Sequence, residues 1–230
     1  MTTMPTTDRI KQAVGYKAAE LVENGMLIGL GTGSTVFFFI ERLIQKCREG
    51  LKIQAIASSN RSLQQAREGN IPLLDVDKVT ALDLTVDGAD EIDPQKRMIK
   101  GRGGAHVREK IVASMSREMI VIVDEKKLVP QLGKCKLPVE ILPFARNSIF
   151  HHIGKAGYRG EFRKKEDGTL YITDNDNLLV DIHFDSPREQ PEQDHETLIH
   201  IPGVVDTGFF FNLAGRIIVG FADGQIVVNS

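Results

Sequence analysis

Up to about residue 130, the chain alternates short apolar runs with segments in which apolar residues recur every three or four positions. The apolar runs predict buried strands at 26–30, 52–57, 82–87 and 119–124, and a short one at 98–100. The helical spacing predicts helices over about 10–22, behind the candidate caps Thr6 and Thr7, and over 36–47, 61–68 and 104–116. Such alternation is typical of a mostly parallel sheet with helices on both faces.

The pattern changes after about Leu132. It predicts a strand at 137–143, a helix at 144–157, strands at 170–173 and 177–184, and a helix near 192–200, which together suggest a small antiparallel α+β domain. The polar stretch 186–196 indicates a solvated loop. We expect the apolar runs at 204–211, 216–222 and 225–228 to rejoin the main sheet.

Composition and charge exclude several classes of protein. The chain has 230 residues, 41% hydrophobic and 26% charged, with a net charge of −2. These values fit an ordinary globular protein without a global basic field that would recruit nucleic acid or anionic lipid. Cys47 and Cys135 lack CxxC spacing, and no apolar run is long enough for a signal peptide or membrane span. We therefore expect a soluble cytoplasmic protein with reduced thiols.

The first candidate site is the glycine-rich sequence GLGTGST at 29–35, between a predicted strand and a predicted helix. Glycines let the backbone approach a ligand, and the amides at the start of a helix bind anions. No lysine follows Gly33, so the sequence is not a Walker A loop, and Thr35 replaces the last glycine of the dinucleotide fingerprint. A phosphate or sugar site, a dinucleotide site and a tight turn without a ligand all remain open.

The second candidate is VDGADEID at 86–93, where Asp87, Asp90, Glu91 and Asp93 follow a buried strand. Crowded carboxylates raise the pKa of one or more members, which suits proton transfer or metal binding. The alternative is an acidic surface turn. EF-hand spacing is absent and the histidines lack metal-ligand spacing, so we expect no metal site.

The third candidate is KGRGGAHVREK at 100–110, a lysine, a glycine turn and the start of a helix. No lysine or arginine stands three or four residues from Glu109, and most residues at those positions are small or apolar. Partial burial would raise the pKa of Glu109 and make it a better proton acceptor, although an exposed helical glutamate is the alternative. His106 is expected to be structural. Because an arginine interrupts the glycines, we expect negative φ at Arg102 and positive φ at Gly101, Gly103 or Gly104.

Taken in order, these motifs resemble ribose-5-phosphate isomerase, type A. The resemblance also covers LGKCKLPVEILP at 132–143, TDNDN at 173–177 and IPGVVDTGFF at 201–210. It implies an α/β fold in which a Rossmann-like domain, residues 1–132 and 206–230, carries an inserted α+β domain, residues 133–205. It also implies a homodimer or homotetramer that interconverts ribose 5-phosphate and ribulose 5-phosphate without a cofactor.

The resemblance further implies the roles of individual residues. Glu109 matches the glutamate that moves the proton between C1 and C2, and Asp87 the aspartate that opens the sugar ring. Asp90 and Lys100 match groups that hold hydroxyls and stabilise the enediolate. The substrate-binding residues implied are Thr32, Gly33, Ser34, Thr35, Asp87, Gly88, Ala89, Asp90, Lys100, Gly101, Arg102, Gly103 and Lys127. Arg102 and His106 depart from the family, which usually has glycine and an apolar residue there.

Two other classes of function stay open. One is an enzyme of similar fold that acts on another sugar phosphate, such as a 6-phosphogluconolactonase or an amino-sugar-phosphate deaminase. The other is a non-catalytic sugar-phosphate sensor, as in the effector domains of some transcriptional repressors. Only about ten residues precede the first predicted helix, which leaves no room there for a helix-turn-helix. A sensor would also have no need of both Lys100 and Glu109.

Overall fold

The computed structural model describes residues 5–229, which divide into two compact units. The first unit comprises the described residues up to 89, residues 108–127 and those from 213 onward, and the second comprises 90–107 and 128–212. The units break the chain at other residues than the domain boundaries expected from the sequence, and those boundaries stay a prediction.

The first unit is built on a six-stranded sheet in the order β13-β12-β6-β3-β1-β2. The pairs from β12 to β2 are all parallel, and only the edge strand β13 is antiparallel to its neighbour. This confirms the mostly parallel sheet predicted from the apolar runs. Its strands are β1 (Leu27–Leu30), β2 (Gln54–Ala57), β3 (Leu84–Asp87), β6 (Met119–Asp124), β12 (Ala214–Gly220) and β13 (Ile226–Asn229).

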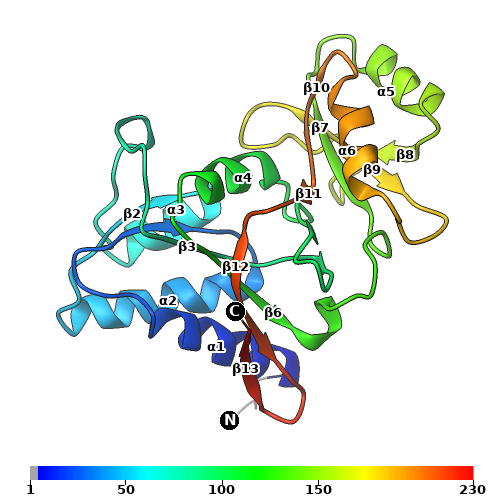
Figure 1. Cartoon of the computed structure of the whole chain (residues 1–230). Helices are drawn as coiled ribbons and strands as arrows, with labels where there is room; N and C mark the ends of the chain where they lie inside the picture. The colour runs from blue at the N-terminus through cyan, green and yellow to red at the C-terminus, as the bar shows by residue number, and fades with distance from the viewer. Residues whose placement is uncertain (1–4, 230) are drawn as a thin grey trace. The chain divides into compact units, whose positions relative to one another are not determined.

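Helices cover both faces of this sheet, as Figure 1 shows for α1 and α2 on one face and α4 on the other. Alternate residues of β1 explain the two layers, because side chains along a strand point to opposite faces. Ile28 and Leu30 pack with the α1–α2 layer, whereas a side chain at Gly29 would meet Val112 of α4. The helices are α1 (Thr6–Ala19), α2 (Ser34–Arg48), α3 (Asn60–Glu68) and α4 (His106–Ser114), with 3₁₀ turns η1 (Val76–Lys78) and η2 (Glu125–Lys127).

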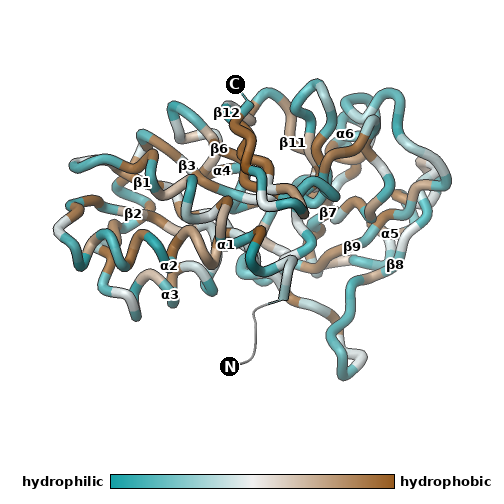
Figure 2. The backbone as a smooth tube through the Cα atoms, turned by 90° about the horizontal axis from the view of Figure 1, so that it is seen from below, coloured by the Kyte–Doolittle hydropathy of each residue, from teal (hydrophilic) through white to brown (hydrophobic). Residues whose placement is uncertain are grey.

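The core of the first unit follows from the uninterrupted apolar strands. Every residue of β6 is buried, which is typical of a parallel strand covered on both faces. The neighbouring strand β12 is also largely apolar, and Figure 2 shows its hydrophobic colour.

No helix in the described part of the chain is long and apolar enough to cross a membrane.

The second unit contains a four-stranded antiparallel sheet, β10-β7-β9-β8, and a three-stranded sheet, β11-β5-β4. Val139 and Val180, on neighbouring strands, pack in one apolar cluster with Ile149 of α5 and Leu198 of α6. The elements are β4 (Glu91–Ile92), β5 (Met98–Ile99), β7 (Leu137–Ile141), α5 (Arg146–Lys155), β8 (Arg159–Phe162), β9 (Leu178–His183), α6 (Pro191–Ile199), β10 (Val204–Thr207) and β11 (Phe209–Phe210).

The run 204–211 does not join the main sheet, contrary to our expectation. Its first half is β10, which pairs with β7, and its second half is β11, which pairs with β5. Gly208 separates the two: its amide donates to Pro138 O, and its carbonyl accepts from Lys100 N. An apolar run predicts that a strand is buried, but it does not indicate which neighbouring strand it pairs with. The error therefore lies in the choice of sheet.

Three local expectations are also wrong. The polar stretch 186–196 is a loop only up to Gln190, because α6 begins at Pro191, where proline suits the first helical turn, and Asp194 is buried against Arg188 and Tyr158; this confirms the helix predicted near 192–200. Residues 170–173 form isolated bridges instead of a strand, and the strand at 159–162 was missed. Thr6 and Thr7 lie inside α1, whose N-cap position is Pro5.

Candidate active site

In the first unit, the glycine-rich turn joins β1 to α2 at the carboxyl end of the sheet. Gly33 occupies the N-cap position with φ of 111°, and no side chain caps the helix. No side-chain cap therefore uses the amides of the first turn of α2. An anion site requires such amides as donors. Ser34 is exposed and Thr35 is half-buried.

Asp87, the last residue of β3, holds this turn in place. Its side chain is fully buried, and Oδ1 accepts hydrogen bonds from the amides of Thr32 (3.0 Å) and Gly88 (2.8 Å). A side chain at Gly31 would overlap the Asp87 carboxyl group, so glycine is needed there. The hydroxyl of Thr32 lies 2.9 Å from that of Ser58, which follows β2.

Three adjacent parallel strands of this unit therefore carry predicted site residues at their carboxyl ends. The order β6-β3-β1 places the turn 31–35 after β1, Asp87 at the end of β3 with Gly88 and Ala89 behind it, and Lys127 in η2, directly after β6. Ligands in open α/β sheets bind at this edge. Lys127 is half-buried, whereas its neighbour Lys126 is exposed.

Glu109 belongs to the same unit and lies on α4. Its exposed fraction is only 4%, so the structure favours the buried carboxylate over the exposed helical glutamate. Val112 and Ala113, three and four residues further along the helix, are also buried. A carboxylate in such surroundings is held away from bulk water, which suits a proton acceptor.

The other carboxylates of the segment 86–93 are not a joint cluster. Glu91 is buried and accepts hydrogen bonds from the amides of Gly133, Lys134 and Cys135. Asp93 is buried and accepts from Arg97 Nε at 2.7 Å. Both therefore shape turns of the second unit, and the acidic surface turn that we considered does not form. The described residues contain no group of three or more His, Cys, Asp or Glu that could hold a metal ion.

Asp90 and Lys100 lie together in the second unit. The amide of Asp90 donates to Ile99 O at 2.8 Å, directly before Lys100. Lys100 is buried, with Nζ 5.4 Å from the centre of the Phe210 ring. The Asp90 carboxylate accepts a hydrogen bond from Arg102 N at 2.9 Å, which ties Asp90 to the glycine turn.

The glycine turn has the backbone that the sequence predicts. Gly101 has φ of 102° and Gly104 φ of 79°, while Arg102 is not among the described non-glycine residues with positive φ. The Arg102 side chain is exposed, as is Gly103. His106 is fully buried, and a Cβ at Gly101 would lie 2.9 Å from its Nδ1. This packing supports the structural role expected for His106.

Some residues that shape these parts carry no clear signal in the sequence. Ser58 has a weak one, because it directly follows a predicted strand. Arg163 and Tyr171 have none: both bond to the turn 101–103 from more than sixty residues away along the chain.

Comparisons with known proteins agree on one family. The family model described as "Ribose 5-phosphate isomerase A (phosphoriboisomerase A)" matches residues 54–224. A ribose-5-phosphate isomerase A from Protochlamydia amoebophila is 52% identical over 217 residues, which are 94% of each chain.

Solved structures give the same result. Ribose 5-phosphate isomerase from Plasmodium falciparum is 39% identical, with a TM-score of 0.93 over 97% of this chain and 98% of that one. A D-ribose-5-phosphate isomerase in complex with phospho-erythronic acid is 35% identical, with a TM-score of 0.92 over 99% of this chain and 100% of that one. With motifs, fold and all three comparisons in agreement, this chain belongs to the ribose-5-phosphate isomerase A family.

Proposed function

We propose that this chain interconverts D-ribose 5-phosphate and D-ribulose 5-phosphate through an enediolate, with Glu109 as the group that removes and returns the proton. Membership of the family makes the chain an isomerase of these two sugar phosphates. The assignment of roles to residues is our proposal. It joins the family resemblance to the burial and contacts of each side chain.

The phosphate of the substrate is the anchor in this mechanism. The helix α2 starts after β1, and Lys127 follows β6 at the same edge of the sheet. We assign the phosphate dianion to the helix amides and the Lys127 ammonium group. A solved relative is in complex with phospho-erythronic acid, a phosphorylated acid, which supports this chemistry for the fold. Binding energy from the phosphate fixes the reacting carbons.

The chemical step is the transfer of a weakly acidic proton next to a carbonyl group. One base can remove the proton from C2 of the aldose and return it to C1, and a well-positioned base contributes about 10²–10⁴-fold. Glu109 suits this role because it is buried on a helix and is a carboxylate. This is the observation that carries the proposal.

Lys100 and the two aspartates complete the proposed machinery. Negative charge develops on oxygen as the enediolate forms, and the buried ammonium group of Lys100 can stabilise it. We assign ring opening to Asp87 and the holding of hydroxyl groups to Asp90, as the resemblance implies. The substrate contacts proposed for Thr32 to Thr35, Gly88, Ala89 and Gly101 to Gly103 follow in the same way.

A coupled assay for ribulose 5-phosphate tests the activity. We expect turnover of ribose 5-phosphate and none of 6-phosphogluconolactone or glucosamine 6-phosphate. Turnover of either of the latter without ribose 5-phosphate would contradict the proposal. Binding of sugar phosphates with no turnover would instead indicate a sensor.

We also propose that the chain acts as a homodimer or homotetramer in the cytoplasm, with a small sugar phosphate and neither nucleic acid nor membrane as its partner. The net charge of −2 supports the absence of a general nucleic-acid field. Light scattering after size exclusion measures the oligomeric state, and a monomer at micromolar concentration would contradict that part.

A further inference from the structure

The turn that follows Lys100 is held by side chains from a distant part of the second unit. Arg163, just beyond β8, donates from Nη1 to the carbonyl oxygens of Gly101 and Arg102, each at 3.0 Å. The hydroxyl of Tyr171 donates to Gly103 O at 3.1 Å. Two side chains thus hold the carbonyl groups of three consecutive residues, 101–103.

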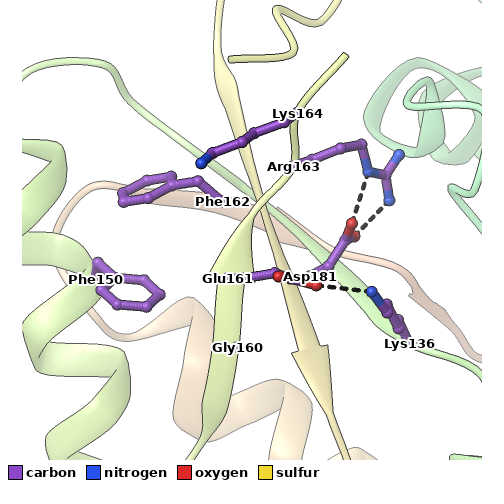
Figure 3. A pocket seen from close by; sticks show the side chains of 8 residues that line it. All are labelled: Lys136, Phe150, Gly160, Glu161, Phe162, Arg163, Lys164 and Asp181. Atoms are coloured by element: carbon purple, nitrogen blue, oxygen red, sulfur yellow. Dashed lines mark hydrogen bonds and ion pairs between the residues drawn. The ribbon is translucent and has the colours of Figure 1, made fainter. Parts of the chain in front are cut away.

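Arg163 is itself held in a fixed orientation. Its Nε donates to Oδ2 of Asp181 at 2.9 Å, and its Nη2 donates to Oδ1, as Figure 3 shows. The exposed fractions of these two side chains are 14% and 11%. A bidentate pair of this kind fixes the plane of the guanidinium group, so its remaining nitrogen points at the turn.

The peptide unit between Gly101 and Arg102 connects Arg163 to Asp90. In a trans peptide the C=O and the following N–H lie in one plane and point in opposite directions. Here the C=O of Gly101 accepts from Arg163, and the N–H of Arg102 donates to Asp90 Oδ2 at 2.9 Å. Hydrogen bonds at both ends of one peptide also polarise and strengthen each other.

We infer that Arg163 is a positioning residue for Asp90, acting through the peptide unit Gly101–Arg102. The inference rests on the substrate-holding role that we propose for Asp90. Arg163 itself makes its bonds to Asp181 and to backbone carbonyls. Its effect on catalysis passes through the direction of one N–H group.

The surroundings of Arg163 provide a matched control. Arg163 lines a pocket of about 530 Å³ together with Lys136, Glu161 and Asp181 (Figure 3). Lys136, directly before β7, pairs with Glu161 of β8 at 2.8 Å, and both side chains are at least half exposed. Within the described part of the chain, neither Lys136 nor Glu161 bonds to the turn 101–103. Lys136→Ala therefore breaks only a neighbouring ion pair, and we expect it to leave kcat/KM unchanged.

Arg163→Lys is the main test variant. Lysine keeps the charge near Asp181 but cannot bond to the carboxylate in a bidentate way and reach both carbonyl groups as well. We expect kcat/KM for ribose 5-phosphate to fall at least ~10-fold, since small misplacements of catalytic groups are costly. Asp181→Asn, which keeps the shape of the pair, should give a smaller loss and serves if Arg163→Lys does not fold.

A double-mutant cycle separates positioning from a structural role. In an Asp90→Ala background, we expect Arg163→Lys to lower kcat/KM by no more than ~2-fold further, because the group that it positions is gone. Equal losses in both backgrounds, or unchanged kcat/KM in Arg163→Lys alone, would overturn the inference while leaving the role of Asp90 intact. Normal kcat/KM in Asp90→Ala would overturn both that role and the inference.

Discussion

The carboxylate of Asp87 accepts a hydrogen bond from the main-chain amide of Thr32, 55 residues earlier in the chain, at 3.0 Å. The bond joins the end of β3 to the turn after β1, two neighbouring parallel strands. A proposed catalytic carboxylate and the proposed phosphate turn are therefore fixed relative to each other within the first unit.

Gly31→Ala should disturb this arrangement. A methyl group there would overlap the Asp87 carboxyl group and lie 2.5 Å from Val86 O, so we expect a loss of about 1–3 kcal/mol in the free energy of unfolding together with reduced kcat/KM. Urea unfolding and steady-state kinetics measure both. Gly154→Ala is the control, because open space surrounds that helical glycine and alanine should stabilise it by about 0.5–1 kcal/mol. Equal stability of the two variants would contradict the prediction.

Glu109→Gln should keep the fold and substrate binding but lower kcat at least ~10²-fold, the low end for loss of a general base. The amide has nearly the shape of the carboxylate and cannot accept the proton. Glu68→Gln, at an exposed position of α3, should leave kcat unchanged. A Glu109→Gln enzyme with normal kcat would remove Glu109 from the mechanism.

Lys127→Ala should mainly raise KM for ribose 5-phosphate. A phosphate dianion needs a cation in addition to helix amides, and Lys127 is the half-buried lysine after β6. Lys126→Ala, in the same 3₁₀ turn but exposed, is the matched control and should leave KM unchanged. A fall in kcat at constant KM in Lys127→Ala would show that the residue is not a phosphate anchor.

Prolonged treatment with EDTA should leave the activity intact. The carboxylates after β3 have separate partners, since Glu91 bonds to the amides of residues 133–135 and Asp93 to Arg97. In the mechanism that we propose, Lys100 supplies the positive charge that the enediolate requires. The readout is the coupled assay before and after dialysis. Loss of activity that Mg²⁺ or Mn²⁺ restores would refute the prediction.

Gly101→Ala and Arg102→Gly should destabilise the protein by different amounts. Gly101 has φ of 102° and packs against His106, so alanine there should cost at least about 1–2 kcal/mol. Arg102 is exposed and lacks positive φ, so glycine should cost only about 0.4–1 kcal/mol through the entropy of the unfolded chain. Thermal unfolding of the two variants measures both losses of stability. A larger loss in Arg102→Gly than in Gly101→Ala would contradict the conformation of the turn.

Much of the fold could be predicted because the spacing of apolar residues along the chain indicates which residues of each strand and helix are buried. The apolar runs located β1, β2, β3 and β6, and their alternation with helices predicted the parallel sheet. The same signal could not choose the partners of β10 and β11, which pair with β7 and β5. Strand pairing depends on register and on the rest of the chain, which a single apolar run does not contain.

The candidate site divides in the same way. Residue type and local order alone determined the family resemblance, the position of Glu109 on a helix and the negative φ of Arg102, because each depends on neighbours in the chain. Only the tertiary structure decided that Glu91 supports the turn 133–135, that Asp87 holds Thr32, and that Arg163 reaches the carbonyl of Gly101. A carboxylate or guanidinium group acquires its role from the donors and acceptors around it, and in a folded chain these come from distant segments.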